Sequence, residues 1–366
     1  KIQPTEESLI KLKSRLEIVK KILIVPGQQR PNAQIQSILD ELSSNTNAVV
    51  VTDTISNLQS DQTISFHDHW LGHLEISENL KPDLIISFGK SVISKSLKLF
   101  LRKSHASHWH VQEDGAAKDT FQRLTRNITA TPLFFLNWLN QNLAAQDSHF
   151  YQAWHFLEKS VSKDLSMVLR GQPFGEYSAL SICMDKIPYP SKIHVANSMA
   201  VRYLNLLGKR SQEIICNRGT SGIDGSNSTA VGCTFTTKEI VTLVTGDMAF
   251  FYDRNAFWHN YTIPNLRIIL LNNHAGGIFR LIDGPANQPE LEEFFETKQK
   301  LTAEHLATEF GFFYSKVVNQ EELEASLQDF YKDSLHPKIL EIETSSPKNA
   351  EILKSVKEKI KLSLVN

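Results

Sequence analysis

The feature that most constrains the fold of this chain is the recurrence of short, β-branched apolar runs separated by amphipathic helical patterns. Strands that alternate with helices are typical of parallel sheets that carry helices on both faces. The predicted strands lie at residues 22–25, 49–52, 84–88, 108–111, 193–195, 214–216, 240–245, 266–271, 314–318 and 339–342. We therefore predict an α/β protein with two doubly wound parallel sheets and a closing helix over 348–364.

The length of the chain, 366 residues, suggests two domains of ordinary size. We expect a central α/β domain over 1–150, a helical connection over 151–191 and a second α/β domain over 192–366. The connection is rich in aromatic residues and then punctuated by Gly and Pro. A hydrophobic share of 41% with 22% charged residues excludes disorder for most of the chain.

The charge balance and the cysteines limit the partners and the compartment. With 39 basic and 40 acidic residues, the chain has no global field to attract nucleic acid or an anionic membrane. We find no apolar run near the length of about 18 residues that a membrane span needs. The three cysteines, Cys183, Cys216 and Cys233, form no Cys-x-x-Cys pair and favour a reducing compartment, so we expect the cytoplasm. The chain begins with Lys1, and we expect it to be a fragment or a processed product.

The strongest chemical signal is Gly246-Asp247 at the end of one predicted strand and Asn272-Asn273 at the end of the next. Carboxyl ends of parallel strands meet at one edge of a sheet, so the Asp247 and Asn273 side chains are expected to converge there. Carboxylate and amide oxygens suit Mg²⁺, whose shell phosphate oxygens complete. Gly246 lets a diphosphate approach the backbone, and the following helix directs N–H groups at it. The alternative is a turn and a helix cap, which either piece alone would favour.

These residues resemble the signature of thiamine-diphosphate enzymes, although Met248 stands where that signature usually has Gly. Three longer motifs resemble one family among them, the 2-succinyl-5-enolpyruvyl-6-hydroxy-3-cyclohexene-1-carboxylate synthases of menaquinone biosynthesis. The motifs are VANSMAVR at 195–202, NRGTSGIDG at 217–225 and NNHAGGIF at 272–279. The resemblance is specific over the second predicted domain and looser over the first.

The resemblance implies which residues hold the cofactor and its metal ion. Thiamine diphosphate would contact Ser221, Gly222, Ile223, Gly246, Asp247, Met248, Ala249, Asn273, Ala275 and Gly276. Mg²⁺, or Mn²⁺ in its place, would be held by Asp247, Asn273 and the backbone carbonyl of Ala275. The resemblance gives Ile223 a catalytic part, since a branched apolar side chain there would press the cofactor into a bent shape. Plain core packing is the alternative for Ile223.

The substrates implied by the resemblance are 2-oxoglutarate and isochorismate, which both carry carboxylates. Arg202 and Arg218 are the candidates to bind them, because a guanidinium grips a carboxylate with two parallel hydrogen bonds. Ser198 lies four residues before Arg202 and is expected on the same helix face. Ile278 and Phe279 would form an apolar wall, and Lys95 would be a further substrate contact from the central domain. For each Arg, the alternative is a solvated ion pair.

As an enzyme, such a chain would be part of a transferase that decarboxylates 2-oxoglutarate and adds the succinyl unit to isochorismate. The Glu that activates the cofactor in the family lies in an amino-terminal pyrimidine-binding domain, which we expect this chain to lack. The family's active site lies between subunits, so we expect a homodimer or homotetramer, and an inactive, weakly binding chain when it is alone. Another thiamine-dependent decarboxylase or carboligase, or a non-catalytic binding module, remains as an alternative.

Two other features have competing interpretations. The polar segment 283–300 contains Gly and Pro and is expected to be a lid that is mobile without ligand. Several histidines have metal-like spacing, but we interpret them as packed or solvated because no recognised set of Cys or Glu ligands accompanies them. They are His67, His69, His73, His105, His108 and His110. We interpret Cys216 as a buried strand residue.

Overall fold

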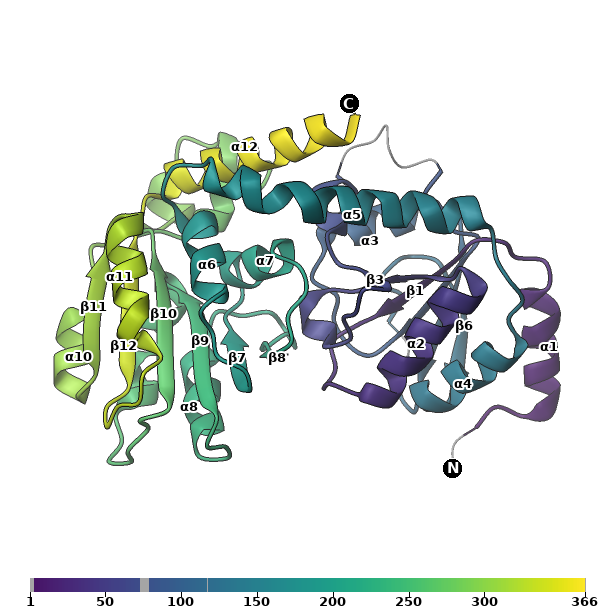
Figure 1. Cartoon of the computed structure of the whole chain (residues 1–366), viewed down its shortest axis with the longest axis horizontal. Helices are drawn as coiled ribbons and strands as arrows, with labels where there is room; N and C mark the ends of the chain where they lie inside the picture. Colours follow the sequence, from purple (N-terminus) through teal and green to yellow (C-terminus); the bar gives the residue numbers. More distant parts are fainter. Residues whose placement is uncertain (1–2, 73–78, 117, 366) are drawn as a thin grey trace. The chain divides into compact units, whose positions relative to one another are not determined.

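The computed structural model describes residues 3–72, 79–116 and 118–365, without the side chain of Val365. The chain divides into two compact units, which are drawn in Figure 1. The first comprises Lys1–Lys163, Gly208–Arg210 and Ser363–Asn366, and the second comprises Asp164–Leu207 and Ser211–Leu362. Each unit contains one six-stranded sheet in which every strand pair is parallel, so the predicted fold class is confirmed.

The sheet of the first unit has the strand order β3-β2-β1-β4-β5-β6, which is doubly wound from β1. Its strands are β1 (Ile22–Pro26), β2 (Val49–Val51), β3 (Thr63–Ile64), β4 (Leu84–Phe88), β5 (Ser107–Gln112) and β6 (Leu124–Thr129). The prediction placed β1, β2, β4 and β5 correctly but did not include β3 and β6. These two strands form the edges of the sheet, where β3 has only two residues and β6 is largely polar and exposed.

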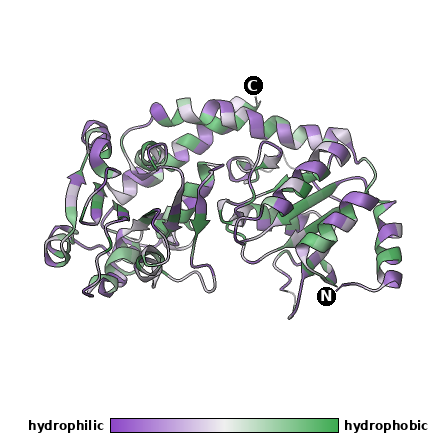
Figure 2. Cartoon of the chain, turned by 60° about the horizontal axis from the view of Figure 1, so that its bottom comes forward, coloured by the Kyte–Doolittle hydropathy of each residue, from purple (hydrophilic) through white to green (hydrophobic). Residues whose placement is uncertain are grey.

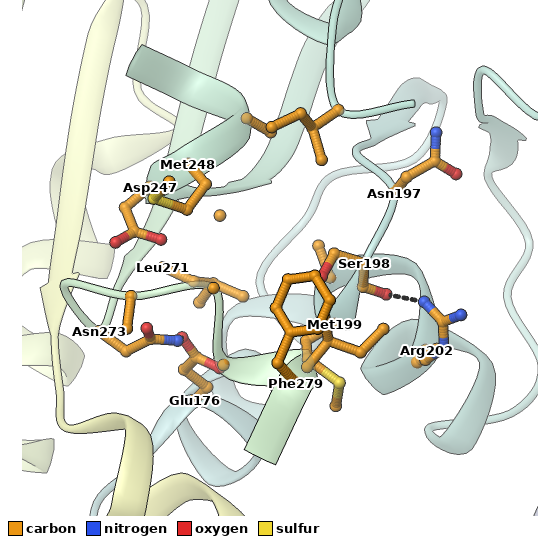
Figure 3. A pocket seen from close by; sticks show the side chains of 18 of the residues that line it. Glu176, Asn197, Ser198, Met199, Arg202, Asp247, Met248, Leu271, Asn273 and Phe279 are labelled. Carbon is orange, nitrogen blue, oxygen red and sulfur yellow. Dashed lines mark hydrogen bonds between the residues drawn. The ribbon is translucent and has the colours of Figure 1, made fainter. Parts of the chain in front are cut away.

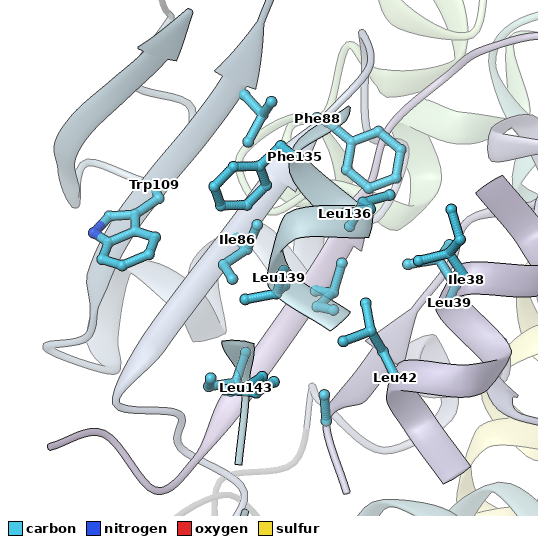
Figure 4. Close-up of a cluster of buried hydrophobic side chains, with 14 of the residues drawn as sticks. Ile38, Leu39, Leu42, Ile86, Phe88, Trp109, Phe135, Leu136, Leu139 and Leu143 are labelled. Carbon is cyan, nitrogen blue, oxygen red and sulfur yellow. The ribbon is translucent and has the colours of Figure 1, made fainter. Parts of the chain in front are cut away.

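Helices cover both faces of this sheet. They are α1 (Glu6–Leu16), α2 (Ala33–Thr46), α3 (Lys95–Lys103), α4 (Pro132–Asn142) and α5 (Ser148–Arg170), with 3₁₀ turns η1 (Thr54–Ser56) and η2 (His67–His69). Figure 4 shows one core, in which Leu39 of α2 and Phe135 of α4 pack over Ile86 of β4. Figure 2, which is coloured by hydropathy, shows that the strands of this sheet are mainly hydrophobic, whereas its helices carry both hydrophobic and hydrophilic residues. The helices therefore bury one stripe and expose the other.

The carboxyl edge of the first sheet is closed at its topological switch point, between β1 and β4. Gly27 follows β1 and Gly89 follows β4, and the two loops hydrogen-bond to each other through Gln28 N to Ser91 O (2.9 Å) and Lys90 N to Gln28 O (3.0 Å). A Cβ atom on Gly27 would lie 2.3 Å from Lys90 O, so only glycine permits this approach. The glycines here bring two loops together.

The sheet of the second unit has the order β11-β12-β10-β9-β7-β8. Its strands are β7 (Ser191–Val195), β8 (Glu213–Ile215), β9 (Ile240–Gly246), β10 (Leu266–Asn272), β11 (Phe313–Val317) and β12 (Lys338–Glu343). All six were predicted, within one or two residues at each end. Strands β8 and β9 lie on opposite sides of β7 in the sheet. The direction in which strands are added therefore reverses between β7 and β9, which is the topological switch point. Because Gly246 pairs with Leu271, the ends of β9 and β10 are level.

The helices of the second unit also form two layers (Figure 1). They are α6 (Glu176–Met184), α7 (Met199–Leu206), α8 (Ser226–Thr234), α9 (Asp247–Tyr252), α10 (Glu304–Phe310), α11 (Gln320–Phe330) and α12 (Ser346–Val365). Shorter turns are η4 (Arg254–Phe257), η5 (Gly277–Leu281), η6 (Pro285–Asn287) and the π-helical η7 (Leu291–Phe295). One core joins α8, α9 and α10 to β9, β10 and β12. In the part of the chain that is described, no helix is long and apolar enough to cross a bilayer.

Candidate functional site

A cavity of about 590 Å³ lies at the carboxyl edge of the second sheet, next to the β7/β9 switch point (Figure 3). This is where open α/β sheets bind ligands. Its lining comprises Glu176, Asn197, Ser198, Met199, Ala200, Arg202, Arg218, Ser221, Ile223, Gly246, Asp247, Met248, Ala249, Leu271, Asn273, Ala275, Gly276, Gly277, Ile278, Phe279, Ile282, Phe295 and Thr297. Of the predicted site residues, only Gly222 and Lys95 are outside this lining.

Asp247 is the first residue of α9 and is 2% exposed. Its Oδ2 accepts a hydrogen bond from Gln299 Nε2 at 2.8 Å, and the backbone N–H groups of Met248 and Ala275 also bond to the carboxylate. Burial raises the pKa of Asp247 to about 6, although these hydrogen bonds oppose the increase. At pH 7 a negative charge therefore lies at the end of β9. Helix α9 has only six residues, so the side chain, more than a helix dipole, defines this end of the cavity.

Asn273 presents an amide whose two ends have different surroundings. Its Nδ2 donates a hydrogen bond to Glu176 Oε1 at 2.6 Å, while its buried Oδ1 has no hydrogen-bond partner among the described residues. An unpartnered buried carbonyl oxygen costs about 1–3 kcal/mol, and a hard cation would supply the missing partner. Figure 3 shows Asn273 and Asp247 on the same side of the cavity. The residues therefore fit a divalent cation.

The backbone around these two residues leaves room for a ligand. A Cβ atom on Gly246 would meet no heavy atom of the described chain within 4 Å, so this glycine faces open space. The carbonyl of Ala275 accepts one hydrogen bond, from Gly277 N at 2.9 Å, and keeps a second lone pair. Ala275 O can thus still bind a cation.

Strained backbone also occurs around the cavity. Ser198 and Ser221 line it and have φ values of 69° and 63°, and His274, between Asn273 and Ala275, has φ of 59°. Such conformations cost non-glycine residues about 1–3 kcal/mol each and concentrate at ligand sites.

The adjacent asparagine, Asn272, has a different role from Asn273. It is fully buried, and its Nδ2 donates to Glu341 Oε1 (2.6 Å) and to Leu301 O (2.9 Å). Its Oδ1 accepts from the backbone N–H of His274 at 3.1 Å. Asn272 therefore fixes the loop that carries Asn273.

Two arginines, Arg202 and Arg218, line the cavity, and Figure 3 shows Arg202 on the side away from Asp247. Arg202 Nη1 donates to the backbone oxygen of Ser198 at 2.6 Å, the dashed contact in Figure 3. Arg218 Nη1 donates to Asn197 Oδ1 at 2.8 Å. Asn197 Nδ2 in turn donates to Asn217 O (2.7 Å) and to Gly222 O (2.6 Å). Asn197 thereby positions Arg218, and it connects Gly222, which does not itself line the cavity.

Apolar side chains complete the lining, and the predicted lid contributes to it. The Phe279 and Phe295 rings lie 5.9 Å apart. The second half of the segment 283–300 is fixed by Glu296, a fully buried residue that accepts from Arg280 Nε (3.0 Å) and Nη2 (2.6 Å). The backbone N–H of Gly276 also donates to Glu296 O at 2.6 Å. The segment therefore joins the loop that holds the predicted metal ligands.

Lys95 is the first residue of α3 and belongs to the first unit. It does not line the cavity, and its contact with substrate stays a prediction.

His67, His108 and His110 have partners in the first unit, and Cys216 Sγ donates to Asn197 Oδ1 at 3.6 Å. His67 Nε2 lies 3.3 Å from Asp53 Oδ1, and Ser87 Oγ bonds to His108 Nε2 (2.7 Å) and His110 Nδ1 (2.8 Å). Within residues 3–72, 79–116 and 118–365, no group of three or more His, Cys, Asp or Glu is placed to hold a metal ion. His73 lies outside the described residues. Cys216 is buried directly after β8, and burial raises its pKa to about 11.

Three residues whose side chains hydrogen-bond to the side chains of predicted site residues were not predicted as site residues: Glu176, Asn197 and Gln299. Glu176 lies in the stretch that we predicted to be a connection, 97 residues before its partner Asn273. Gln299 lies 52 residues after Asp247. No local spacing links such pairs. Only the position of Asn197 beside Ser198, within a motif already recognised, could have indicated it.

Comparison with known proteins identifies the class of this chain. The sequence profile of a family described as the middle domain of thiamine pyrophosphate enzymes matches residues 6–191. The chain therefore belongs to this family of thiamine pyrophosphate enzymes.

More particular similarity is found to curated 2-succinyl-5-enolpyruvyl-6-hydroxy-3-cyclohexene-1-carboxylate synthases. The relative from Cytophaga hutchinsonii is 41% identical over 99% of this chain and 65% of its own length. Those from Christiangramia forsetii and Porphyromonas gingivalis are 36% and 33% identical, over 90% and 92% of this chain and 59% and 60% of their own lengths. The chain thus spans about 59–65% of the length of these relatives.

Proposed function

We propose that this chain is the metal- and diphosphate-binding part of a 2-succinyl-5-enolpyruvyl-6-hydroxy-3-cyclohexene-1-carboxylate synthase. This transferase would join the succinyl unit of 2-oxoglutarate to isochorismate with loss of carbon dioxide, a step of menaquinone biosynthesis. The proposal is supported by the similarity to synthases over nearly the whole chain. The single observation that carries it is the buried, unpartnered Oδ1 of Asn273 in the cavity that Asp247 also lines.

The described side chains suggest how the groups would be held. Asp247, Asn273 and the Ala275 carbonyl would bind Mg²⁺ or Mn²⁺, and Gly246 would admit the diphosphate. When bound, thiamine diphosphate would supply the electron sink for decarboxylation and carbon–carbon bond formation. Ile223 would support the bent shape of the cofactor, with Ser221, Met248, Ala249 and Gly276 around it. The two positive charges of the cation would thus be balanced by the Asp247 carboxylate and by the diphosphate.

The remaining residues would act on the substrates. Arg202 and Arg218 would bind the carboxylates, since a guanidinium pairs well with a carboxylate in a partly desolvated cavity. Ser198 would lie beside them, and Ile278 and Phe279 would exclude water from the ring of isochorismate. The activating Glu is not assigned to any residue of this chain. A homodimer or homotetramer in the cytoplasm, with Lys95 reaching substrate, belongs to the same proposal.

The metal assignment is tested with Asp247→Ala and a matched substitution of an exposed residue, Asp329→Ala. We expect Asp247→Ala to weaken thiamine diphosphate binding by about tenfold or more when Mg²⁺ is present, because the variant loses a charged ligand of the metal ion. When a chelator removes the metal ion, we expect no loss of affinity. Isothermal titration calorimetry measures both affinities. Unchanged affinity in Mg²⁺ after Asp247→Ala would contradict the assignment, and Asp329→Ala is expected to bind like the parent.

A second experiment tests whether the chain alone is catalytically active. Produced alone, the chain is expected to consume no 2-oxoglutarate, with or without isochorismate, because no residue here is assigned to activate the cofactor. The assay follows carbon dioxide release. Turnover by the chain alone would show that it contains a complete active site, and turnover independent of isochorismate would favour another decarboxylase.

A further inference from the structure

Glu176 is a buried carboxylate in the cavity that no motif of the sequence indicates. It is 2% exposed and begins helix α6. Its Oε1 accepts a hydrogen bond from Asn273 Nδ2 at 2.6 Å, and the two side chains face each other in Figure 3. A carboxyl group is buried in a protein only when directed hydrogen bonds compensate for its lost hydration, so the partners of Glu176 indicate its role.

The chemistry of the two groups determines how the Asn273 amide is oriented. Burial raises the pKa of the Glu176 carboxyl group to about 7. Once ionised, this carboxylate only accepts hydrogen bonds, whereas an amide has a donating end and an accepting end. Rotation of the amide by half a turn would place Oδ1 against the carboxylate and direct the Nδ2 hydrogens into the cavity. The first contact would be repulsive, and a cation would meet donors in place of a lone pair. Glu176 therefore selects the orientation in which Oδ1 is available.

The surroundings of Glu176 prevent the carboxylate from turning away. Its backbone N–H donates to Asn349 Oδ1 of α12 at 3.0 Å, and the Tyr203 hydroxyl of α7 hydrogen-bonds to the carboxylate. Helix α6 lies close to α12, because a Cβ atom on Gly175 would be 2.4 Å from Ile352 Cδ1. Elements distant in sequence thus hold this side chain in place.

A purely structural role as a helix cap does not explain these contacts. At the start of α6, the Gly175 N–H donates to Ser178 Oγ at 3.2 Å, so the terminus has its own capping interaction. The Glu176 carboxylate instead contacts a residue of the loop after β10. We propose that Glu176 is a positioning residue that orients Asn273 so that Oδ1 faces the divalent cation. This inference rests on the proposed function.

The test is Mn²⁺ binding by the whole chain with inorganic pyrophosphate, read from the electron paramagnetic resonance signal of free Mn²⁺. Glu176→Leu removes the acceptor, and we expect the Kd for Mn²⁺ to rise about tenfold or more, as is usual for residues that orient metal ligands. Glu176→Gln keeps an acceptor oxygen but adds a donor, so its Kd is expected between those of the parent and Glu176→Leu. Glu351→Leu, at an exposed position of α12, is the control.

The same substitutions in an Asn273→Ala background show whether Glu176 acts through Asn273. If Glu176 acts only by orienting Asn273, its substitution has no effect once Asn273 is absent. We therefore expect both Glu176 substitutions to change the Kd for Mn²⁺ by less than about twofold in this background. Equal losses in both backgrounds would mean that the carboxylate acts as a general negative charge, and this would overturn the inference. An unchanged Kd in the parent background would overturn it as well.

Two further outcomes are distinguishable. If Glu176→Leu does not fold, as judged by circular dichroism, Glu176→Gln carries the test. A rise in its Kd only when Asn273 is present supports the inference, and any other result overturns it. If the parent chain binds no Mn²⁺, or Asp247→Ala leaves binding unchanged, the proposed function fails and this inference with it.

Discussion

At the scale of single residues, Asn197 links two parts of the cavity. Its Oδ1 holds Arg218, and its Nδ2 holds the carbonyls of Asn217 and Gly222. It thereby links an arginine of the cavity with the loop that carries Ile223. A residue of this kind supports the site without being part of the chemistry.

We expect Asn197→Ala to lower the free energy of unfolding by about 2–3 kcal/mol, because two carbonyls and a guanidinium nitrogen lose buried partners. Urea unfolding followed by circular dichroism measures this change. Asn137→Ala, on the exposed side of α4, is the control and is expected to stay within about 0.5 kcal/mol of the parent. A loss at Asn197 no larger than at Asn137 would show that water replaces these hydrogen bonds.

The sequence predicted those site residues that lie within a few positions of a strand end. Asp247 and Asn273 follow buried strands directly, and the register of parallel strands then brings them together. Glu176 and Gln299 act on these same two residues, but each comes from a different part of the chain. Their contacts depend on how helices and loops pack over the sheet, which periodicity does not describe.

At the scale of elements, the inner strands of both sheets and the edge strands β8 and β11 were predicted, whereas the edge strands β3 and β6 were not. Strands β9 and β10 are nearly continuous apolar runs, because both of their faces are covered. Strand β6 (Leu124–Thr129) contains Arg126 and Asn127 and has one hydrogen-bonded neighbour, so its composition resembles a loop. Burial on both faces leaves a clear sequence pattern, whereas an edge strand of two residues or one that is largely polar does not.

Helix α11 ends on a buried arginine of β10. Arg267 donates through Nε to Phe330 O (2.7 Å), through Nη2 to Lys332 O (2.9 Å) and through Nη1 to Pro264 O (2.7 Å). We expect Arg267→Met to lower the free energy of unfolding by about 3–5 kcal/mol, since these carbonyls lose charged donors in the interior. Thermal denaturation with Lys332→Met as an exposed control measures the effect. Equal melting temperatures for the two variants would contradict this role.

The predicted lid, 283–300, is expected to move in one half only. Glu296 fixes the second half through Arg280, whereas η6 (Pro285–Asn287) lies among exposed residues. Hydrogen exchange followed by mass spectrometry is expected to be faster over 283–290 than over 294–300, because exposed backbone opens more readily. Arg280→Met is expected to remove the difference. Equally slow exchange in both halves would show that the segment is not a lid.

At the scale of the whole molecule, two buried histidines, His108 and His155, contribute stability to the first unit that is lost in acid. Burial lowers the pKa of His108 and His155 to about 4 each, with smaller contributions from His110 and Lys159 respectively. These side chains take up protons near pH 6.5 when unfolded but only near pH 4 when folded. Their contribution to the free energy of unfolding is therefore present above about pH 6.5 and is lost as the pH falls toward 4.

We expect the free energy of unfolding of the first unit to fall by about 2 kcal/mol for each of these histidines between pH 7 and pH 5. Tryptophan fluorescence reports this unit selectively, because Trp70, Trp109, Trp138 and Trp154 lie in it and only Trp258 does not. Urea titrations of a Trp258→Phe variant at the two pH values measure the change. Replacing His108 by Gln is expected to reduce the pH dependence, and replacing the exposed His149 by Gln is not.

The two neighbouring asparagines after β10 have a consequence for mutational surveys. A survey that measures only cell growth or product formation would find that Asn272 and Asn273 tolerate substitution equally poorly, although the reasons differ. Loss of Asn272 removes donors to Glu341 and Leu301, so the variant would disappear from the soluble fraction. Loss of Asn273 would leave abundant protein that an excess of cation could partly rescue. Measuring abundance beside function is therefore necessary to interpret this dipeptide in any homologue.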